Sequence, residues 1–135
     1  MIKSLQLSPS RQGLIEFTDE LNALINQWKL KEGLCTIFVK HTSCSLTIQE
    51  NADPSARDDL ENWLNRLVSE NDPIYTHIFE GADDMPSHIK AALTATSLSI
   101  PFQNRRLCLG TWQGVFLWEH RHRPGKRTVV VHLGQ

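Results

Sequence analysis

Hydrophobic residues along the chain follow two patterns, one typical of strands and one typical of helices. Strand-like segments at 2–8 and 13–17 predict a first β-hairpin with the turn PSRQ between them. A helical period follows and predicts a helix over 18–33, with Thr18 as its N-cap and Gly33 as its stop. The buried stripe of this helix is expected to comprise Leu21, Leu24, Ile25 and Trp28.

The middle of the chain predicts two strands and two more helices. β-Branched and aromatic residues dominate 34–50, which indicates two strands separated near His41. A helix follows, because Asp53 can cap its first turn and Pro54 fits its first position. A third, shorter helix is predicted to open within EGADDMPSHIKAAL. The core side of the second helix is expected to comprise Leu60, Trp63, Leu64 and Leu67.

Four strand-like segments make up the C-terminal part of the chain: TSLSIPF, RRLCLG, GVFLWEH and RTVVVHL. The connections between them leave no room for crossover helices, so the sheet is expected to be mainly antiparallel or mixed. With about three helices, this pattern predicts an α+β fold. The length of 135 residues fits a single compact domain over 1–135.

Composition narrows the class of protein. Hydrophobic residues make up 40% and charged residues 21%, as in ordinary globular proteins. The net charge of -1 argues against bulk electrostatic binding of nucleic acid or of an anionic membrane. No apolar run approaches the ~20 residues of a membrane span. Because the 3 cysteines lie in apolar segments and the first residues lack a leader pattern, we expect a reducing, cytosolic setting.

Candidate chemistry concentrates in the stretch DDMPSHIK. His88 follows Asp84 by four residues, so both can share one helical face if the helix begins that early. A carboxylate beside an imidazole raises its basicity and fixes its tautomer, as a general base or a metal ligand requires. Helix capping alone is the alternative interpretation for the aspartates.

Polar residues at element boundaries offer further candidates. His41 stands at a predicted strand end, followed by Thr42 and Ser43, and a strand end can direct a side chain into a pocket. Asn51 precedes the second helix. A solvated histidine and local capping are the alternatives here.

The stretch GTWQGVFLWEH combines an exposed turn with a strand. Gly110 and Gly114 bracket Trp112 and Gln113, which suggests close backbone approach with an exposed ring and amide. Glu119 interrupts an apolar strand face, and a buried carboxylate needs a partner such as a histidine or a metal.

The 6 histidines suggest a metal site, although no compact ligand motif is present. His41, His77 and His88 are the preferred ligands, because each lies beside an element boundary. The basic run RHRPGKR, which includes Arg127, is interpreted as a solvated hairpin tip, with a phosphate clamp as the alternative.

Several of these segments together resemble the YjbQ-like family, which is uncharacterised and is also labelled secondary thiamine-phosphate synthase. They are HTSCSLTIQENADP, YTHIFEGADDMPSHIKAAL, SLSIPF and LGTWQGVFLWEHRHRPGKRTVVVHLG. The resemblance covers most of the chain from about Leu34 onward and implies a compact α+β domain that commonly assembles as a trimer. One departure is EGADDMP, where many members carry a GEGN-like run, so a stiffer loop and a different pocket shape are expected. The positions that match the family motifs are His41, Ser43, His77, Asp84, His88, Trp112, Gln113 and Glu119.

The resemblance and the residues together predict a small enzyme that acts on a phosphorylated heterocyclic metabolite. The family label implies joining a pyrimidine diphosphate to a thiazole phosphate, which needs Mg²⁺ and cationic phosphate contacts. In this hypothesis His88 is an acid/base or ligand oriented by Asp84, and His41 and His77 complete the ligand set for a divalent metal, Mg²⁺ or Zn²⁺. Glu119 is a second base or a ligand. The substrate-binding residues are expected to be Ser43, Asn51, Trp112, Gln113 and Arg127.

Two other functions use the same residues. One is metal-dependent hydrolysis by an activated water. The other is a non-catalytic trimeric module that binds a small metabolite or anion.

Overall fold

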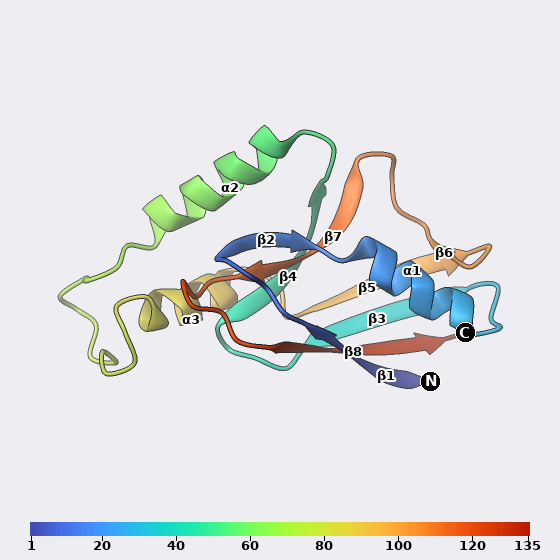
Figure 1. Cartoon of the computed structure of the whole chain (residues 1–135), viewed down its shortest axis with the longest axis horizontal. Helices are drawn as coiled ribbons and strands as arrows, with labels where there is room; N and C mark the ends of the chain where they lie inside the picture. The colour runs from blue at the N-terminus through green and yellow to red at the C-terminus, as the bar shows by residue number, and fades with distance from the viewer.

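The computed structural model describes all residues from Met1 to Gln135 and contains two antiparallel β-sheets and three helices (Figure 1). The strands are β1 (Ile2–Leu7), β2 (Gly13–Glu16), β3 (Gly33–Val39), β4 (Cys44–Glu50), β5 (Ser97–Gln103), β6 (Arg106–Leu107), β7 (Gln113–Glu119) and β8 (Arg127–Gly134). The helices are α1 (Thr18–Gln27), α2 (Pro54–Leu67) and α3 (Asp84–Leu93). One sheet has the order β1-β8-β3-β5-β6 and the other β2-β7-β4. The predicted α+β fold is confirmed.

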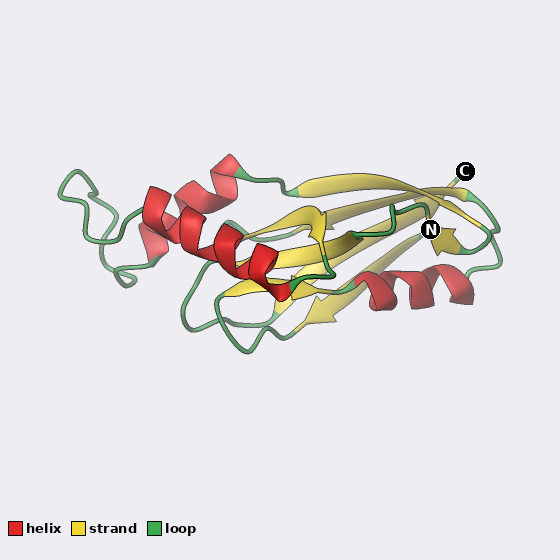
Figure 2. Ribbon diagram, turned by 90° about the horizontal axis from the view of Figure 1, so that it is seen from above, coloured by secondary structure: helices red, strands yellow, loops and turns green.

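The main core lies between the two sheets. Alternate residues of β3, such as Cys35 and Ile37, belong to the same buried cluster as Leu117 of β7. α1 contributes Leu21 and Ile25, which are fully buried. Figure 2 shows α1 at one end of the sheets and α2 and α3 together toward the other end. The loops around α3 therefore lie outside this core, at one end of the molecule.

The three-stranded sheet is buried on both faces. Leu117 of β7 joins the main core, whereas Phe116 and Trp118 pack with Leu64 of α2 in a second cluster. This burial explains why β7 is an unbroken apolar run rather than an alternating one. The strand ends at Glu119, which is itself fully buried.

β1 and β2 do not form the predicted hairpin. β1 pairs with β8, whereas β2 pairs with β7 in the other sheet. The connection between them crosses from one sheet to the other. The hairpin prediction was wrong because the residues of a strand indicate which of its faces is buried, not which strand lies beside it.

α1 begins and ends differently from the predicted helix. It starts at Thr18 itself, and Phe17 occupies the N-cap position. The hydroxyl of Thr18 donates to Glu16 Oε2 at 2.8 Å and accepts from the N–H of Val115 at 2.9 Å. The helix ends at Gln27, well before Gly33. Thr18 thus ties the helix to β7 instead of capping it.

α2 has the predicted cap but not the predicted core side. Asp53 accepts a hydrogen bond from the N–H of Ser55 at 2.9 Å. Leu64 is buried, but Trp63 and Leu67 are 51% and 55% exposed. Only one stripe of α2 reaches the small sheet, and the segment after the helix projects beyond both sheets (Figure 1). None of the three helices is long and apolar enough to cross a lipid bilayer.

Candidate metal centre

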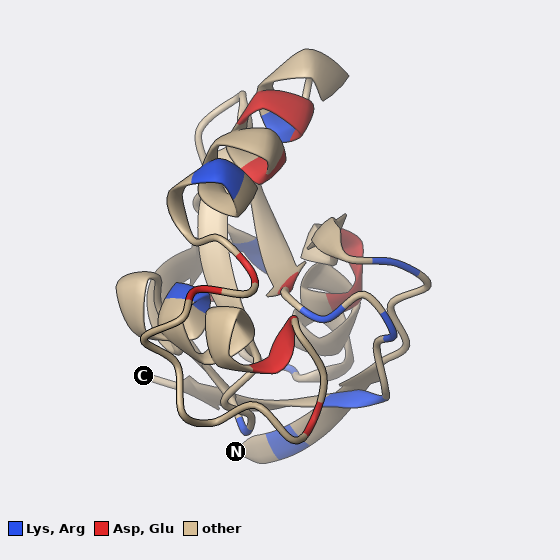
Figure 3. Ribbon diagram, turned by 90° about the vertical axis from the view of Figure 1, so that its left-hand side faces the viewer, with Lys and Arg blue, Asp and Glu red and all other residues tan.

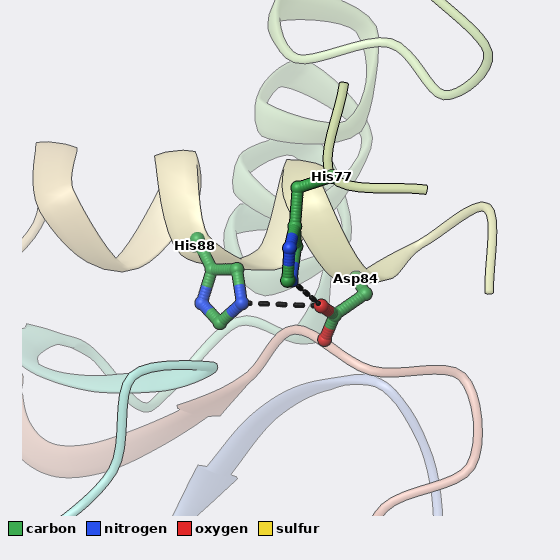
Figure 4. Close-up of side chains that lie close together, drawn as sticks. All are labelled: His77, Asp84 and His88. Atoms are coloured by element: carbon green, nitrogen blue, oxygen red, sulfur yellow. Dashed lines mark hydrogen bonds and ion pairs between the residues drawn. The ribbon is translucent and has the colours of Figure 1, made fainter. Parts of the chain in front are cut away.

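Three side chains converge where α3 begins (Figure 4). His77 Nε2 lies 2.9 Å and His88 Nε2 lies 3.1 Å from the same oxygen, Asp84 Oδ2. One ligand atom from each residue lies within 4.8 Å of the other two. Asp84 is buried, whereas both imidazoles reach solvent. The cluster is therefore a preformed set of ligand atoms at the surface.

The local sequence explains this placement. Because α3 begins at Asp84, Asp84 and His88 lie one turn apart on one face, as their spacing indicates. Pro86 sits in the first turn, where its missing N–H needs no partner. His77 comes from the irregular segment before the helix.

The hydrogen bonds of His88 determine where its protons lie. Nδ1 is 2.9 Å from the carbonyl oxygen of Thr42, which can only accept, so Nδ1 carries a proton. In a neutral ring, Nε2 then has a lone pair and faces the carboxylate oxygen of Asp84, which is also an acceptor. This contact between two acceptors becomes favourable if Nε2 also carries a proton, or if a cation lies between the two atoms. A carbonyl on one ring nitrogen and a free lone pair on the other is typical of metal-binding histidines.

Arg121 holds the opposite side of Asp84. Its Nη1 pairs with Asp84 Oδ1, its Nε donates to Asp83 Oδ2 at 3.2 Å, and its Nη2 donates to the carbonyl of Glu80 at 2.8 Å. Burial raises the pKa of Asp83, but hydrogen bonds from the N–H of His122 and from Arg121 outweigh it and hold that pKa below its usual value. Arg121 thereby occupies one oxygen of Asp84 and leaves the other to the imidazoles.

A polar hollow of about 350 Å³ adjoins this ion-pair network. Figure 3 looks onto this end of the molecule, where acidic and basic residues are interspersed. No hydrophobic residue lines the hollow. Its lining residues are Glu80, Gly81, Asp83, Arg121, His122 and Arg123.

Glu119 and Arg127, predicted to be catalytic and substrate-binding, pair with each other inside the protein. Arg127 Nε donates to Glu119 Oε1 at 2.7 Å, and Arg127 Nη2 contacts Glu119 Oε2. Burial would lower the pKa of Arg127, but its hydrogen bond to Glu119 raises that pKa above the usual value. The pair also binds the carbonyl of Ser43 at 3.3 Å and the N–H of Arg121 at 3.2 Å. The pair therefore anchors two loops beside the cluster, and both carboxylate oxygens of Glu119 are engaged within the protein.

His41, predicted to be the third ligand, lies outside the cluster. Its Nε2 accepts a hydrogen bond from the N–H of Thr128 at 2.8 Å. Burial, with the positive charge of Arg127, lowers the pKa of His41, so the ring is neutral. A lone pair engaged in this way is not free for a metal, and the third residue that converges with His77 and His88 is Asp84.

The structure also separates the predicted substrate residues. Asn51 Nδ2 donates to Glu16 Oε2 at 3.0 Å, and Gln113 Oε1 accepts from the N–H of Gly110 at 2.8 Å. Trp112 beside them is 63% exposed. These residues lie at one end of the β4–β7 pair and Ser43 at the other. The length of β4 places roughly 20 Å between the two groups.

Sequence reasoning missed Arg121 as a site residue. The basic run around it is typical of a solvated hairpin tip, yet the side chain of Arg121 is three-quarters buried against Asp83 and Asp84. These partners lie 38 and 37 residues away in the sequence, so no local pattern indicated the contact.

His120 is a buried titratable residue outside the cluster. Its ring is almost fully buried, and Nε2 lies 2.9 Å from the hydroxyl of Ser45. Burial, together with the positive charges of Lys90 and Arg127, lowers the pKa of His120 from 6.5 to about 3. The folded protein therefore keeps this imidazole neutral at pH values where the unfolded chain protonates it.

We expect this difference to make the fold sensitive to acid. Well above pH 6.5, His120 is neutral in both the folded and the unfolded protein, so it adds no pH dependence to the free energy of unfolding. As the pH falls from 6.5 toward 3, only the unfolded state gains the proton, so the free energy of unfolding decreases. The loss from His120 is about 2 kcal/mol between pH 7 and pH 5. Urea unfolding of wild type and His120→Gln at pH 7 and pH 5 measures this decrease in the free energy of unfolding. If both proteins lost the same free energy, His120 would not be its source.

Comparisons with known proteins agree with this architecture. A family model described as UPF0047 protein YjbQ-like matches residues 3–135. The UPF0047 protein sll1880 of Synechocystis sp. is 52% identical over 129 residues, which cover 96% of this chain and 88% of that protein. The UPF0047 protein YjbQ of Escherichia coli O157:H7 is 45% identical over 132 residues, which cover 97% and 95% of the two chains.

Solved structures give the same result. The conserved hypothetical protein TT1486 from Thermus thermophilus superimposes with a TM-score of 0.87 at 35% identity, over 98% of this chain and 99% of that one. An uncharacterised conserved protein of the YjbQ/UPF0047 family from Clostridium acetobutylicum has a TM-score of 0.84 at 32% identity, over 99% of each chain. The match thus extends over the whole domain, and the chain belongs to the UPF0047 family of YjbQ-like proteins.

Proposed function

We propose that this protein is a small metal-dependent enzyme that acts on a phosphorylated metabolite at the cluster of His77, Asp84 and His88. The contact between His88 Nε2 and Asp84 Oδ2 at 3.1 Å carries the proposal, because a neutral His88 that donates from Nδ1 to Thr42 would present a lone pair to the carboxylate, and a bound cation would bridge the two atoms. His77 Nε2 lies 2.9 Å from the same oxygen. A cation among these atoms would satisfy all three.

The ligand set indicates the kind of metal. Two imidazole nitrogens and one carboxylate oxygen suit Zn²⁺ or another first-row transition metal, whereas Mg²⁺ prefers oxygen ligands and keeps several waters. Three protein ligands are typical of catalytic zinc sites, which keep a position open. A bound cation would polarise a phosphoryl oxygen or lower the pKa of a bound water.

The surrounding residues have distinct roles in this proposal. The carbonyl of Thr42 fixes the tautomer of His88, and Arg121 orients Asp84. In the adjoining polar hollow, Arg123 supplies positive charge for a phosphate group, while His122 is paired with Glu70 and Asp83 with Arg121. The substrate phosphate would therefore lie beside the metal rather than at the Trp112 end of the sheet.

Two reactions fit this arrangement. The family resemblance implies thiamine-phosphate synthesis from a pyrimidine diphosphate and a thiazole phosphate. The ligand set favours a second candidate, hydrolysis of a phosphate ester, because imidazole-rich zinc sites commonly activate water.

Turnover assays on the full chain separate these candidates. The protein is incubated with the two thiamine precursors, and in parallel with p-nitrophenyl phosphate, in the presence of Zn²⁺ or Mg²⁺. We expect metal-dependent turnover that His88→Ala abolishes and His132→Ala retains, because His132 lies on an exposed strand face outside the cluster. Thiamine phosphate identifies a synthase and released phosphate a hydrolase. Metal binding without turnover on either substrate would contradict the enzyme proposal and favour a binding module.

We also propose that the protein assembles as a homotrimer, as the resemblance implies. Trp63 and Leu67 lie one turn apart on α2 and are 51% and 55% exposed, so an apolar face of this helix is open in the single chain. Exposed apolar patches are typical of protein interfaces. Light scattering coupled to size exclusion should give three times 15.4 kDa, and the monomer mass would contradict the proposal.

A further inference from the structure

We infer that a second hollow, formed by the segment 71–85 beside the metal cluster, binds a ring-bearing part of the substrate that is neutral or positively charged. Asp72 selects this charge. The inference deepens the proposed function and rests on it for the position of the reacting phosphate. The segment that lines the hollow lies at the end of the molecule where the chain projects beyond the sheets (Figure 1).

The hollow has the size and chemistry of a small-molecule pocket. Its volume is about 430 Å³, within the range of ligand pockets and large enough for one or two rings. His77 belongs both to this lining and to the metal cluster, so an occupant lies next to the ligand atoms. The hydrophobic part of the lining consists of Tyr75, Ile78, Ala82 and Met85, with Pro73 beside them.

Hydrogen bonds within the segment shape the pocket before anything binds. The Tyr75 hydroxyl donates to the carbonyl of Ser69 at 3.0 Å, and the N–H of Ile74 donates to Asp72 Oδ1 at 3.0 Å. The N–H of Tyr75 donates to the carbonyl of Asp72 at 3.1 Å. Asn71 adopts a left-handed conformation with φ 60, which bends the chain at the pocket entrance. These hydrogen bonds fix the turn at residues 72–75, which forms one wall of the pocket.

With no metal bound at His77, the charge of the lining disfavours an anion in this pocket. No lysine or arginine lines it, whereas Asp72 does. One carboxylate oxygen of Asp72 is occupied by the N–H of Ile74, and the other accepts no hydrogen bond from the protein. An amine or another donor on a ring would satisfy that oxygen, and a phosphate or carboxylate would be repelled.

Gly81 connects this pocket with the polar hollow on the arginine side. It lines both hollows, with φ 108, in the left-handed range that favours glycine. A Cβ at this position would lie 3.2 Å from Asp83 Oδ1 and 3.5 Å from Arg121 Nη2. A bound substrate would therefore pass over Gly81, with its anionic group toward Arg121 and its ring toward Tyr75.

Three probes with the same ring and different charges test the pocket. They are 4-methylbenzylamine, 4-methylbenzyl alcohol and 4-methylbenzoate, titrated into the full chain with chelator present while amide resonances are followed by NMR. We expect the amine to bind at least about tenfold more tightly than the benzoate. The shifted amides should be those of 71–85. Asp72→Asn should reduce the affinity for the amine to that for the alcohol, and Asp58→Asn, which alters an exposed carboxylate on α2, should change nothing.

Two results would overturn the inference. One is benzoate binding as tightly as the amine, which would contradict the role of Asp72. The other is the absence of shifts in 71–85 with all three probes, which would show that the hollow does not accept rings. The chelator keeps metal out of the probe titration, and Zn²⁺ binding is measured in a separate titration. If the probes bind but Zn²⁺ does not, the proposed function is contradicted and this inference is not. Zn²⁺ binding without ring binding would contradict only this inference.

Discussion

Replacing His88 with alanine is expected to weaken Zn²⁺ binding by at least about 100-fold, since loss of a direct ligand should exceed the 10–100-fold cost of losing an outer-shell partner. The substitution removes one of three ligand atoms, whereas Asp84 stays paired with Arg121. The imidazole is partly exposed, so the fold should tolerate its removal. Competition with a chromogenic zinc chelator measures the affinity, and circular dichroism checks that the variant is folded.

His132→Ala is the matched control for this experiment, because it removes an exposed imidazole from β8. It should bind Zn²⁺ as tightly as wild type. Asp84→Asn should weaken binding as His88→Ala does, since it removes the charge shared by the two imidazoles. If all three variants bound Zn²⁺ equally well, the metal would be elsewhere and the proposed centre would be wrong.

Replacing Glu119 with glutamine is expected to reduce the free energy of unfolding by about 3–5 kcal/mol. Glu119 is fully buried and contacts Arg127 through both oxygens, so the substitution leaves a buried guanidinium without its counter-charge. For a domain of this size the loss lowers the melting temperature by roughly 10 °C or more. Urea unfolding and a thermal scan at pH 7 measure both quantities.

A less buried ion pair supplies the control. Arg11 pairs with Glu61 at 2.7 Å, with the Arg11 side chain 50% and the Glu61 side chain 15% exposed, so Arg11→Gln should cost clearly less than Glu119→Gln. The double variant Glu119→Gln with Arg127→Met should recover part of the stability, because no buried charge then lacks a partner. Equal losses for Arg11→Gln and Glu119→Gln would show that the buried pair contributes no more than the less buried one.

Features determined by neighbours in sequence were predictable. The Asp84–His88 pair follows from helical spacing once α3 begins at Asp84, and the Asp53 cap involves only adjacent residues. The α+β class follows from the spacing of strands and helices. In the pair and in the cap the interacting groups are within four residues of each other, where backbone geometry fixes their separation.

Features determined by tertiary pairing were not predictable. The sequence showed that Glu119 needs a partner but not that Arg127 of the next strand supplies it. His41 stands at a strand end as expected, yet the neighbouring β8 occupies its lone pair. Trp63 and Leu67 follow a helical stripe, but the sheet beneath α2 is too small to cover them. These outcomes depend on which elements become neighbours, and no local pattern encodes that.

The origin of the three ligands has a kinetic consequence. Asp84 and His88 belong to one turn of α3, whereas His77 belongs to the irregular segment that precedes it. A cation held by all three closes a chelate ring across seven residues of the chain. Fluctuations confined to this segment can detach His77 while both sheets stay intact, because segments with few buried contacts open at low free-energy cost. Metal exchange would then proceed through a two-coordinate protein intermediate, at a rate independent of global unfolding.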